Sequence, residues 1–179
     1  GCKKLKNVII TKTNIQMGDK VFDKCEELNP IQLPKDFNNV DQLNGIEIKK
    51  VEIGKCGEEC IYTIDEENKL FSIYGSGVLL SIDSTLTEQQ RNQITNITIS
   101  SSITMIGNNL FDSFENLQII NYDGLNEPIC TENGFGSTYL EHVIVPIEYK
   151  SDMNEEVQLT IKGSCGENKY LIDKDTKIM

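Results

Sequence analysis

A pattern of alternating apolar and polar residues recurs along the chain with a 23-residue period. Its first copy has defining residues at Cys2, Leu5, Val8 and Ile10. A second copy has them, one period further on in each case, at Cys25, Leu28, Ile31 and Leu33. Alternate residues of a strand point to opposite faces, so the pattern predicts a short strand in which Val8 and Ile10 are buried while Ile9 faces outward.

The same frame returns in the second half of the chain. Its positions there are Phe114, Leu117, Ile120 and Tyr122, and then, one period later, Ser137, Leu140, Val143 and Val145. Counting back by the same period gives Ile94, Ile97 and Ile99. A Gly-x-x-x-Phe signature precedes the frame, with Gly18 before Phe22 and Gly107 before Phe111, whereas a third copy at 129–135 is one residue out of register. The glycine permits a tight turn, and we expect the phenylalanine to fill the next layer of the core.

A single turn of this kind cannot cover its own apolar face, so successive turns must stack to share a core. The repeats therefore predict a solenoid with parallel strands along one side. Ile, Leu and Val carry most of the 38% hydrophobic fraction, and the many Asn, Ser and Thr residues suit turns and the polar faces of strands. We expect a mainly β chain with short helical or 3-10 turns.

A different module separates the two runs of repeats. It begins with Cys56-Gly57 and ends with Gly75-Ser76-Gly77. Its apolar residues alternate on both sides of a polar stretch at 65–69, at Tyr62, Ile64, Phe71 and Ile73. This pattern predicts a β-hairpin. A shortened copy of the module, residues 165–173, closes the chain and ends before a second strand is complete.

Thr85 and Glu88 have the spacing of a helix capping box, which predicts one or two helical turns over residues 88–93. The sequence thus divides into four parts, which are repeats at 1–54, a Cys-Gly β-hairpin module at 55–82, repeats at 83–150 and the start of a second hairpin module at 151–179. Because the chain opens inside one repeat and ends inside one hairpin, we expect it to be a segment of a longer protein.

The string at residues 17–34 resembles the repeat of the BspA-like class of leucine-rich repeats. The residues that carry the resemblance are Gly18, Phe22, Cys25, Leu28, Ile31, Leu33 and Pro34. The Cys-Gly hairpin is similar to a module that often precedes a repeat block in that family. The sequence departs from the family pattern at Phe114 and Ser137, which replace the cysteine, and at Tyr122-Asp123, which replaces Leu-Pro. The resemblance implies a leucine-rich-repeat-like solenoid of short parallel strands interrupted by a β-hairpin module.

The resemblance also implies a cell-surface or secreted protein of a microbe or a parasitic protist that engages host matrix proteins, other cells or surfaces. We therefore expect a non-catalytic adhesion or protein-interaction segment that binds a protein partner, such as host extracellular matrix, without a cofactor. The outward strand position between the two buried residues of each repeat is the natural contact position. These residues are Ile9, Gln32, Thr98, Asn121 and Ile144.

Composition excludes two classes of partner. The chain has 28 acidic and 17 basic residues, a net charge of −11, and no Lys/Arg cluster long enough to follow a nucleic-acid backbone. No apolar run approaches the roughly 20 residues needed to cross a bilayer, and no apolar stretch follows the lysines near the start. We expect neither nucleic-acid binding nor membrane insertion within this segment.

The six cysteines could form a disulfide framework in an exported chain. Cys2 and Cys25 hold the same position in consecutive repeats, so we expect two packed, buried thiols instead. Cys56 and Cys60 could bridge locally or supply two zinc ligands, but tetrahedral zinc needs four ligands. Because Cys60 has no equivalent in the second module, we expect Cys56, like Cys165, to be a packing residue.

Four other features have a chemical and a structural interpretation. His142 is the only histidine, and we expect it to be a surface residue of a strand. The acidic run at 65–67 lacks the spaced ligand pattern of a calcium loop and predicts a solvated turn. Gly75-Ser76-Gly77 lacks the Lys-Ser/Thr of a phosphate loop. Asn96-Ile97-Thr98 is a formal glycosylation sequon whose two polar residues face outward if Ile97 faces in.

Two alternative functions remain open. One is a polysaccharide-active enzyme on a parallel β-helix, which would need converging Asp, Arg or Lys side chains in adjacent turns, and the aligned positions show none. The other is an intracellular repeat scaffold with reduced cysteines, which would make the protein cytoplasmic rather than surface-exposed.

Overall fold

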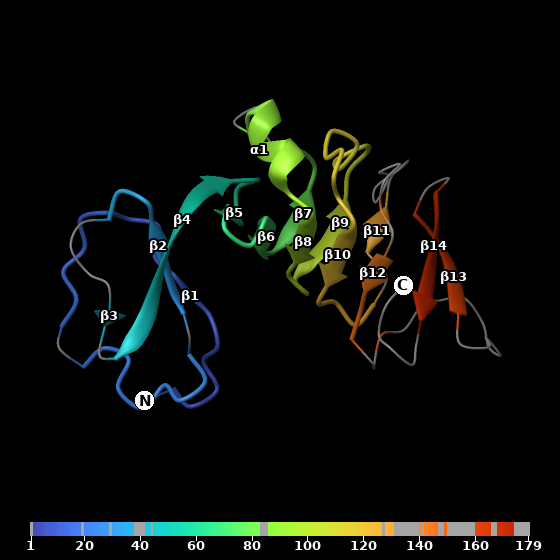
Figure 1. The fold of residues 1–179 in the computed structure, drawn as a ribbon. Coiled ribbons are helices and arrows are strands. Elements are labelled where there is room, and N and C mark those ends of the chain that lie inside the picture. The colour runs from blue at the N-terminus through green and yellow to red at the C-terminus, as the bar shows by residue number, and fades with distance from the viewer. Residues whose placement is uncertain are drawn as a thin grey trace. The chain divides into compact units, whose positions relative to one another are not determined.

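The computed structural model describes residues 2–18, 20–28, 30–37, 42–43, 45–82, 86–126, 128–130, 140, 142–146, 149, 160–165 and 168–173. The chain divides into two compact units, Gly1–Ile53 and Gly54–Met179. Short strands dominate both units (Figure 1). The finer division into four parts by sequence pattern stays a prediction.

The first unit contains parallel strands that follow the repeat. Strand β1 (Val8–Ile9) pairs parallel with β2 (Ile31–Pro34), in a register that places residues one repeat apart opposite each other. β2 pairs parallel with β4 (Ile46–Lys55), and the short β3 (Gln42–Leu43) pairs antiparallel with β4. Positions related by the repeat therefore lie side by side in β1 and β2, as the sequence predicted.

The core of the first unit is small. Its buried residues are Cys25, Leu28, Ile31, Leu33 and Phe37. Val8 and Ile10 were predicted to be buried and Ile9 to face outward, but all three are half-buried. β1 pairs with β2 alone among the described strands, so its side chains are covered from one side only.

The second unit begins with the predicted β-hairpin. Strands β5 (Cys60–Asp65) and β6 (Leu70–Gly75) pair antiparallel. In the turn between them, the backbone N and the Nδ2 of Asn68 donate hydrogen bonds to the Asp65 carboxylate at 3.2 and 2.8 Å. The hairpin prediction is confirmed, and the Asp65 carboxylate orders the turn.

Parallel strands continue the solenoid from the hairpin (Figure 1). β6 pairs with β8 (Asn96–Ile99), β8 with β10 (Ile119–Tyr122), and β10 with β12 (His142–Ile144). A second sheet consists of β7 (Gly77–Leu79), β9 (Ile103–Ile106) and β11, with β9 in the middle and parallel to both neighbours. β11 spans Ile129–Cys130. The chain therefore folds as the predicted mainly β solenoid.

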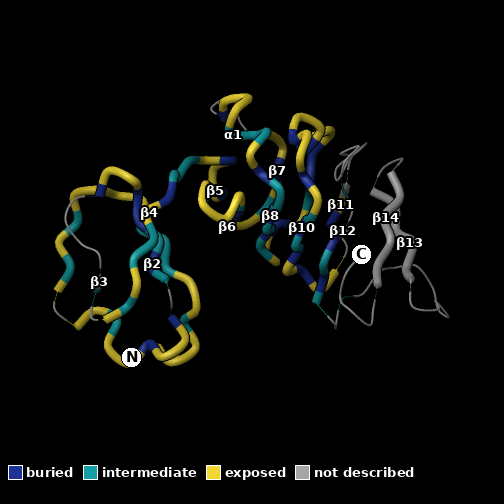
Figure 2. Tube along the Cα trace, in the orientation of Figure 1, coloured by how far each residue is buried: buried dark blue, intermediate teal, exposed yellow. Residues whose placement is uncertain are grey.

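The inward faces of these two sheets share one core, where the tube is dark blue in Figure 2. One inward column crosses the first sheet and is almost fully buried at Phe71, Ile97, Ile120 and Val143. Phe111 is fully buried in this core, as its Gly-x-x-x-Phe signature predicted. Its ring centroid lies 6.2 Å from that of Phe114, which lies 5.9 Å from that of Phe71. Aromatic contacts thus connect successive turns.

The predicted helical turns are present as α1 (Glu88–Gln93), but the predicted cap is wrong. The N-cap is Thr87, whose side chain accepts a hydrogen bond from the backbone N of Gln90 at 3.2 Å. The Gln90 Oε1 accepts from the backbone N of Thr87 at 2.9 Å, which completes the capping box. Thr85 lies outside the described residues. Glutamine fills the role that the sequence pattern assigned to Glu88, because both side chains can accept from the cap N–H.

Near the C-terminus, β13 (Thr160–Cys165) and β14 (Asn168–Asp173) pair antiparallel. The shortened copy of the module at 165–173 was predicted to open a hairpin. Comparison of the two modules did not predict the pairing of β14 with β13, which ends at Cys165. The start of a second hairpin module stays a prediction.

Candidate binding surfaces

Three of the five predicted contact residues form one row on the outward face of the β8–β10–β12 ladder. Thr98 lies opposite Asn121, and Asn121 lies opposite Ile144. All three are half-buried, because side chains crowd on strands about 4.8 Å apart. Ser72 continues the row on the hairpin side but is only 3% exposed. The accessible part, called the outward row below, is therefore Thr98, Asn121 and Ile144.

The other two predicted contact residues lie in the first unit. Ile9 lies opposite Gln32, and Gln32 lies opposite Lys49. Lys49 was missed by the repeat comparison, because the step from β2 to β4 is shorter than the repeat period. The structure brings Ile9 and Gln32 together, and it brings Thr98, Asn121 and Ile144 together, in separate units.

The sequon residues lie on strand β8 as their alternation predicted. Ile97 is fully buried, whereas Asn96 and Thr98 are half-buried on the opposite face. The Asn96 Nδ2 donates a 3.1 Å hydrogen bond to the Thr95 Oγ1. The Asn96 side-chain amide is thus engaged by the preceding residue, and its glycosylation stays a prediction.

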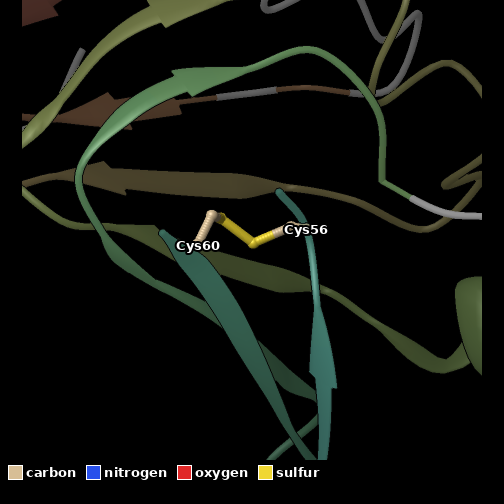
Figure 3. Close-up of a disulfide and its surroundings, with 2 residues drawn as sticks. All are labelled: Cys56 and Cys60. Atoms are coloured by element: carbon tan, nitrogen blue, oxygen red, sulfur yellow. A yellow bond between two sulfur atoms is a disulfide. The ribbon is translucent and has the colours of Figure 1, made fainter. Parts of the chain in front are cut away.

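Cys56 and Cys60 form a disulfide (Figure 3), so the prediction that Cys56 is only a packing residue is wrong. The backbone N of Cys56 donates a 3.0 Å hydrogen bond to the carbonyl oxygen of Cys60. This turn places the two Cα atoms 5.0 Å apart, within the range that a disulfide spans. The missing counterpart of Cys60 in the second module was a poor guide, because the pairing depends on the geometry of this one turn.

The prediction of two packed thiols at Cys2 and Cys25 is correct for one of them. Both are free, but Cys25 is buried and Cys2 is exposed. Cys25 packs within the core of the first unit, whereas Cys2 is not one of the residues of that core.

A cleft of about 470 Å³ lies beside the disulfide. It is lined by residues 56–60 and by residues 76–81 apart from Leu79. The Ser76 Oγ donates a 2.8 Å hydrogen bond to the Glu59 Oε2, and the Ser76 backbone N donates to the Glu59 carbonyl oxygen at 3.1 Å. The Gly75-Ser76-Gly77 segment, which lacks the pattern of a phosphate loop, thus joins the two segments that line this cleft. We call it the disulfide cleft.

A second row of outward residues crosses β7, β9 and β11. Val78 lies opposite Met105, and Met105 lies opposite Ile129. Val78 and Ile129 are 42% and 63% exposed, and Met105 is half-buried. The sequence pattern missed this apolar row because the repeat frame describes the other sheet. We call Val78, Met105 and Ile129 the apolar row.

The described part of the chain contains no group of three His, Cys, Asp or Glu side chains placed to hold a metal ion. The side chain of His142 lies outside the described residues. No described helix combines the length and the apolar character needed to cross a membrane.

One known family of repeats covers most of the chain. The family described as BspA type Leucine rich repeat region matches residues 1–65 and 68–155 in 6 copies. The chain belongs to this family. The resemblance predicted from residues 17–34 is therefore confirmed, and the repeated turns are BspA-type leucine-rich repeats.

A solved leucine-rich repeat protein from Eubacterium ventriosum ATCC 27560 is similar at 16% sequence identity and a TM-score of 0.45. The match covers 57% of this chain and 28% of the other protein, so this chain spans less than a third of that protein's length. No curated protein matches the sequence.

Proposed function

We propose that this chain is a non-catalytic adhesion segment of a BspA-like surface protein, which binds a protein partner such as host extracellular matrix through the outward face of its parallel strands. One observation carries the proposal. The parallel register aligns Thr98, Asn121 and Ile144 into one row across three strands. Residues of three different repeats thereby form one surface.

The outward row suits protein recognition in its chemistry. It combines a hydroxyl, an amide and an aliphatic side chain, which supports mixed hydrogen bonding and apolar contact. The strands behind it are fixed by a core in which Ile97, Ile99 and Ile120 are completely buried. A partner would therefore lose little binding energy in ordering this surface. In the first unit, Ile9 and Gln32 are the equivalent candidates.

The disulfide supports a location in an oxidising compartment, because disulfides persist mainly in secreted and surface proteins. A cell-surface or secreted protein is therefore favoured over an intracellular scaffold. Mass spectrometry of the protein isolated from its own cells, with thiols blocked at lysis, tests this point. A reduced Cys56 and Cys60 pair would favour the cytoplasmic alternative.

Binding of the purified chain to a panel of matrix proteins, measured by biolayer interferometry, tests the adhesion proposal. An Asn121→Arg variant should weaken binding at least about tenfold, because the longer charged side chain stands at the centre of the row. Gln93→Arg on α1 is the matched control, since it adds the same side chain at an exposed site away from the row. Equal affinity of the two variants for every ligand bound would refute the assignment of the row.

Turnover assays on a panel of polysaccharides address the enzymatic alternative. The outward row of the described strands contains no Asp, Glu, Lys or Arg to act as acid, base or charge stabiliser. Hydrolytic or eliminative cleavage of any glycan by the purified chain would overturn the non-catalytic proposal.

A further inference from the structure

The apolar row ends at an acidic cleft. Val78 belongs both to the row and to the lining of the disulfide cleft, which also includes Glu58 and Glu59. Glu59 is fixed by its hydrogen bond from Ser76, and Glu58 is exposed. Leu80, which is 65% exposed, adds apolar surface beside the cleft. One continuous surface therefore has carboxylates at one end and aliphatic side chains along the rest.

Apolar exposure of this kind differs from the scattered exposed residues found on most surfaces. Val78, Met105 and Ile129 occupy corresponding positions on three adjacent strands, so their side chains lie side by side. Contiguous exposed apolar surface bordered by charge is typical of a protein interaction site. The carboxylates at its end favour a partner with positive charge there.

The spacing of the row selects the shape of that partner. Adjacent strands are about 4.8 Å apart, so the row spans about 10 Å from Val78 to Ile129. Residues i, i+4 and i+7 of an α-helix share one face and span about 10.5 Å, which matches the row. Same-face residues of an extended segment are about 6.6 Å apart, so three of them span about 13 Å and do not match the spacing of the row.

We propose that the apolar row and the disulfide cleft together bind a basic amphipathic helix of a partner protein. The helix crosses β7, β9 and β11 with its apolar residues on Val78, Met105 and Ile129. A Lys or Arg one turn before the first apolar contact reaches Glu58. This surface lies on a different sheet from the outward row, so it goes beyond the proposed adhesion function and stands independently of it.

The probe is a fluorescent synthetic helical peptide with leucines at i, i+4 and i+7 and lysines one turn before the first leucine. Fluorescence anisotropy measures its binding to the whole chain. One control peptide has glutamates in place of the lysines, and another has the same composition with a central proline that prevents the helix. We expect the lysine peptide to bind at least about tenfold more tightly than either control.

Substitutions on the protein identify the surface. Val78→Asp and Ile129→Asp should each lower the affinity for the lysine peptide at least about tenfold, because each places a charge on the apolar row. Glu58→Lys should lower the affinity for the lysine peptide and raise the affinity for the glutamate peptide. General loss of structure cannot produce this reversal. Asn121→Asp and Ile144→Asp on the other sheet are the matched controls and should leave peptide binding unchanged.

Far-UV circular dichroism and thermal unfolding show whether each variant is folded. Should an Asp variant fail to fold, Val78→Ser and Ile129→Ser make the same test with a smaller change. The proposal is overturned if no peptide binds, if the proline peptide binds as well as the helical one, or if the Glu58→Lys variant leaves the charge preference unchanged. Loss of matrix binding in Asn121→Arg alone would concern the outward row and not this surface.

Discussion

The Tyr122 hydroxyl donates a 3.0 Å hydrogen bond to the carbonyl oxygen of Ile103, which joins strand β10 of one sheet to strand β9 of the other. Tyr122 is buried, so both partners of this bond are withdrawn from water. The family pattern has Leu at this position, and the sequence comparison identified Tyr122 only as a departure. The departure adds a polar connection between the two sheets.

Removing the hydroxyl should destabilise the second unit. We expect Tyr122→Phe to lower the free energy of unfolding by about 1 to 2 kcal/mol, because it leaves the buried carbonyl of Ile103 without this donor. Urea denaturation measures the change. An unchanged free energy of unfolding in Tyr122→Phe would contradict this role of the hydroxyl.

The same tyrosine predicts a loss of stability in alkali. Burial raises the pKa of Tyr122 above its ordinary value of 10.0, because the charged phenolate is poorly solvated in the core. The folded state thus holds the proton more tightly than the unfolded state. Its contribution to stability is complete below pH 10 and is lost as the pH rises through the higher folded-state pKa. Denaturation at increasing pH should show a steeper fall for the wild type than for Tyr122→Phe, whereas parallel curves would exclude this origin.

The end of the hairpin depends on Gly75. Its φ is +111°, and an added Cβ would lie 1.9 Å from the Glu59 carbonyl oxygen, so Gly75→Ala forces the backbone apart. We expect a loss of about 2 kcal/mol or more. Gly77→Ala is a close control, because Gly77 also has a positive φ, +87°, but has open space around its Cβ position. Thermal unfolding of both variants should show the larger loss at Gly75, and a loss at Gly77 as large as that at Gly75 would contradict the steric contact.

The disulfide should contribute to stability despite its short loop. Replacing Cys56 and Cys60 by serine should lower the free energy of unfolding by about 2 kcal/mol, as expected for a loop of this size. Chemical denaturation measures the loss, and Cys2→Ser at an exposed free thiol should have no effect. Peptide mapping without reductant should recover Cys56 joined to Cys60, and recovery of both as free thiols would refute the bond.

The sequence predicts the sheet of β6, β8, β10 and β12 well, because the repeat period determines which residues of β8, β10 and β12 lie opposite each other. Ile97, Ile120 and Val143 are separated by one repeat period each, and they lie opposite one another in adjacent strands. Parallel stacking of equal turns leaves few other registers. Burial of alternate residues then places Thr98 and Asn121 on the outward face.

The second sheet was not predictable in the same way. Val78 follows the hairpin rather than a repeat, yet it joins Met105 and Ile129 in one row. A β-bulge between Gly77 and Val78 shifts the register there, and no period in the sequence indicates it. The same limit applies to the disulfide and to the Thr87 cap, which depend on local backbone geometry rather than on spacing.

Strand β6 has neighbours that run in opposite directions, since β5 is antiparallel to it and β8 is parallel to it. A ladder of parallel strands can in principle be extended by a like strand of another molecule, which is the usual origin of edge-to-edge aggregation. β5 covers this side of β6 with an antiparallel partner, so β6 presents no free edge to a repeat of another copy. In a long array of repeats, we expect modules of this kind to limit strand pairing between molecules. They would also separate one block of repeats from the next.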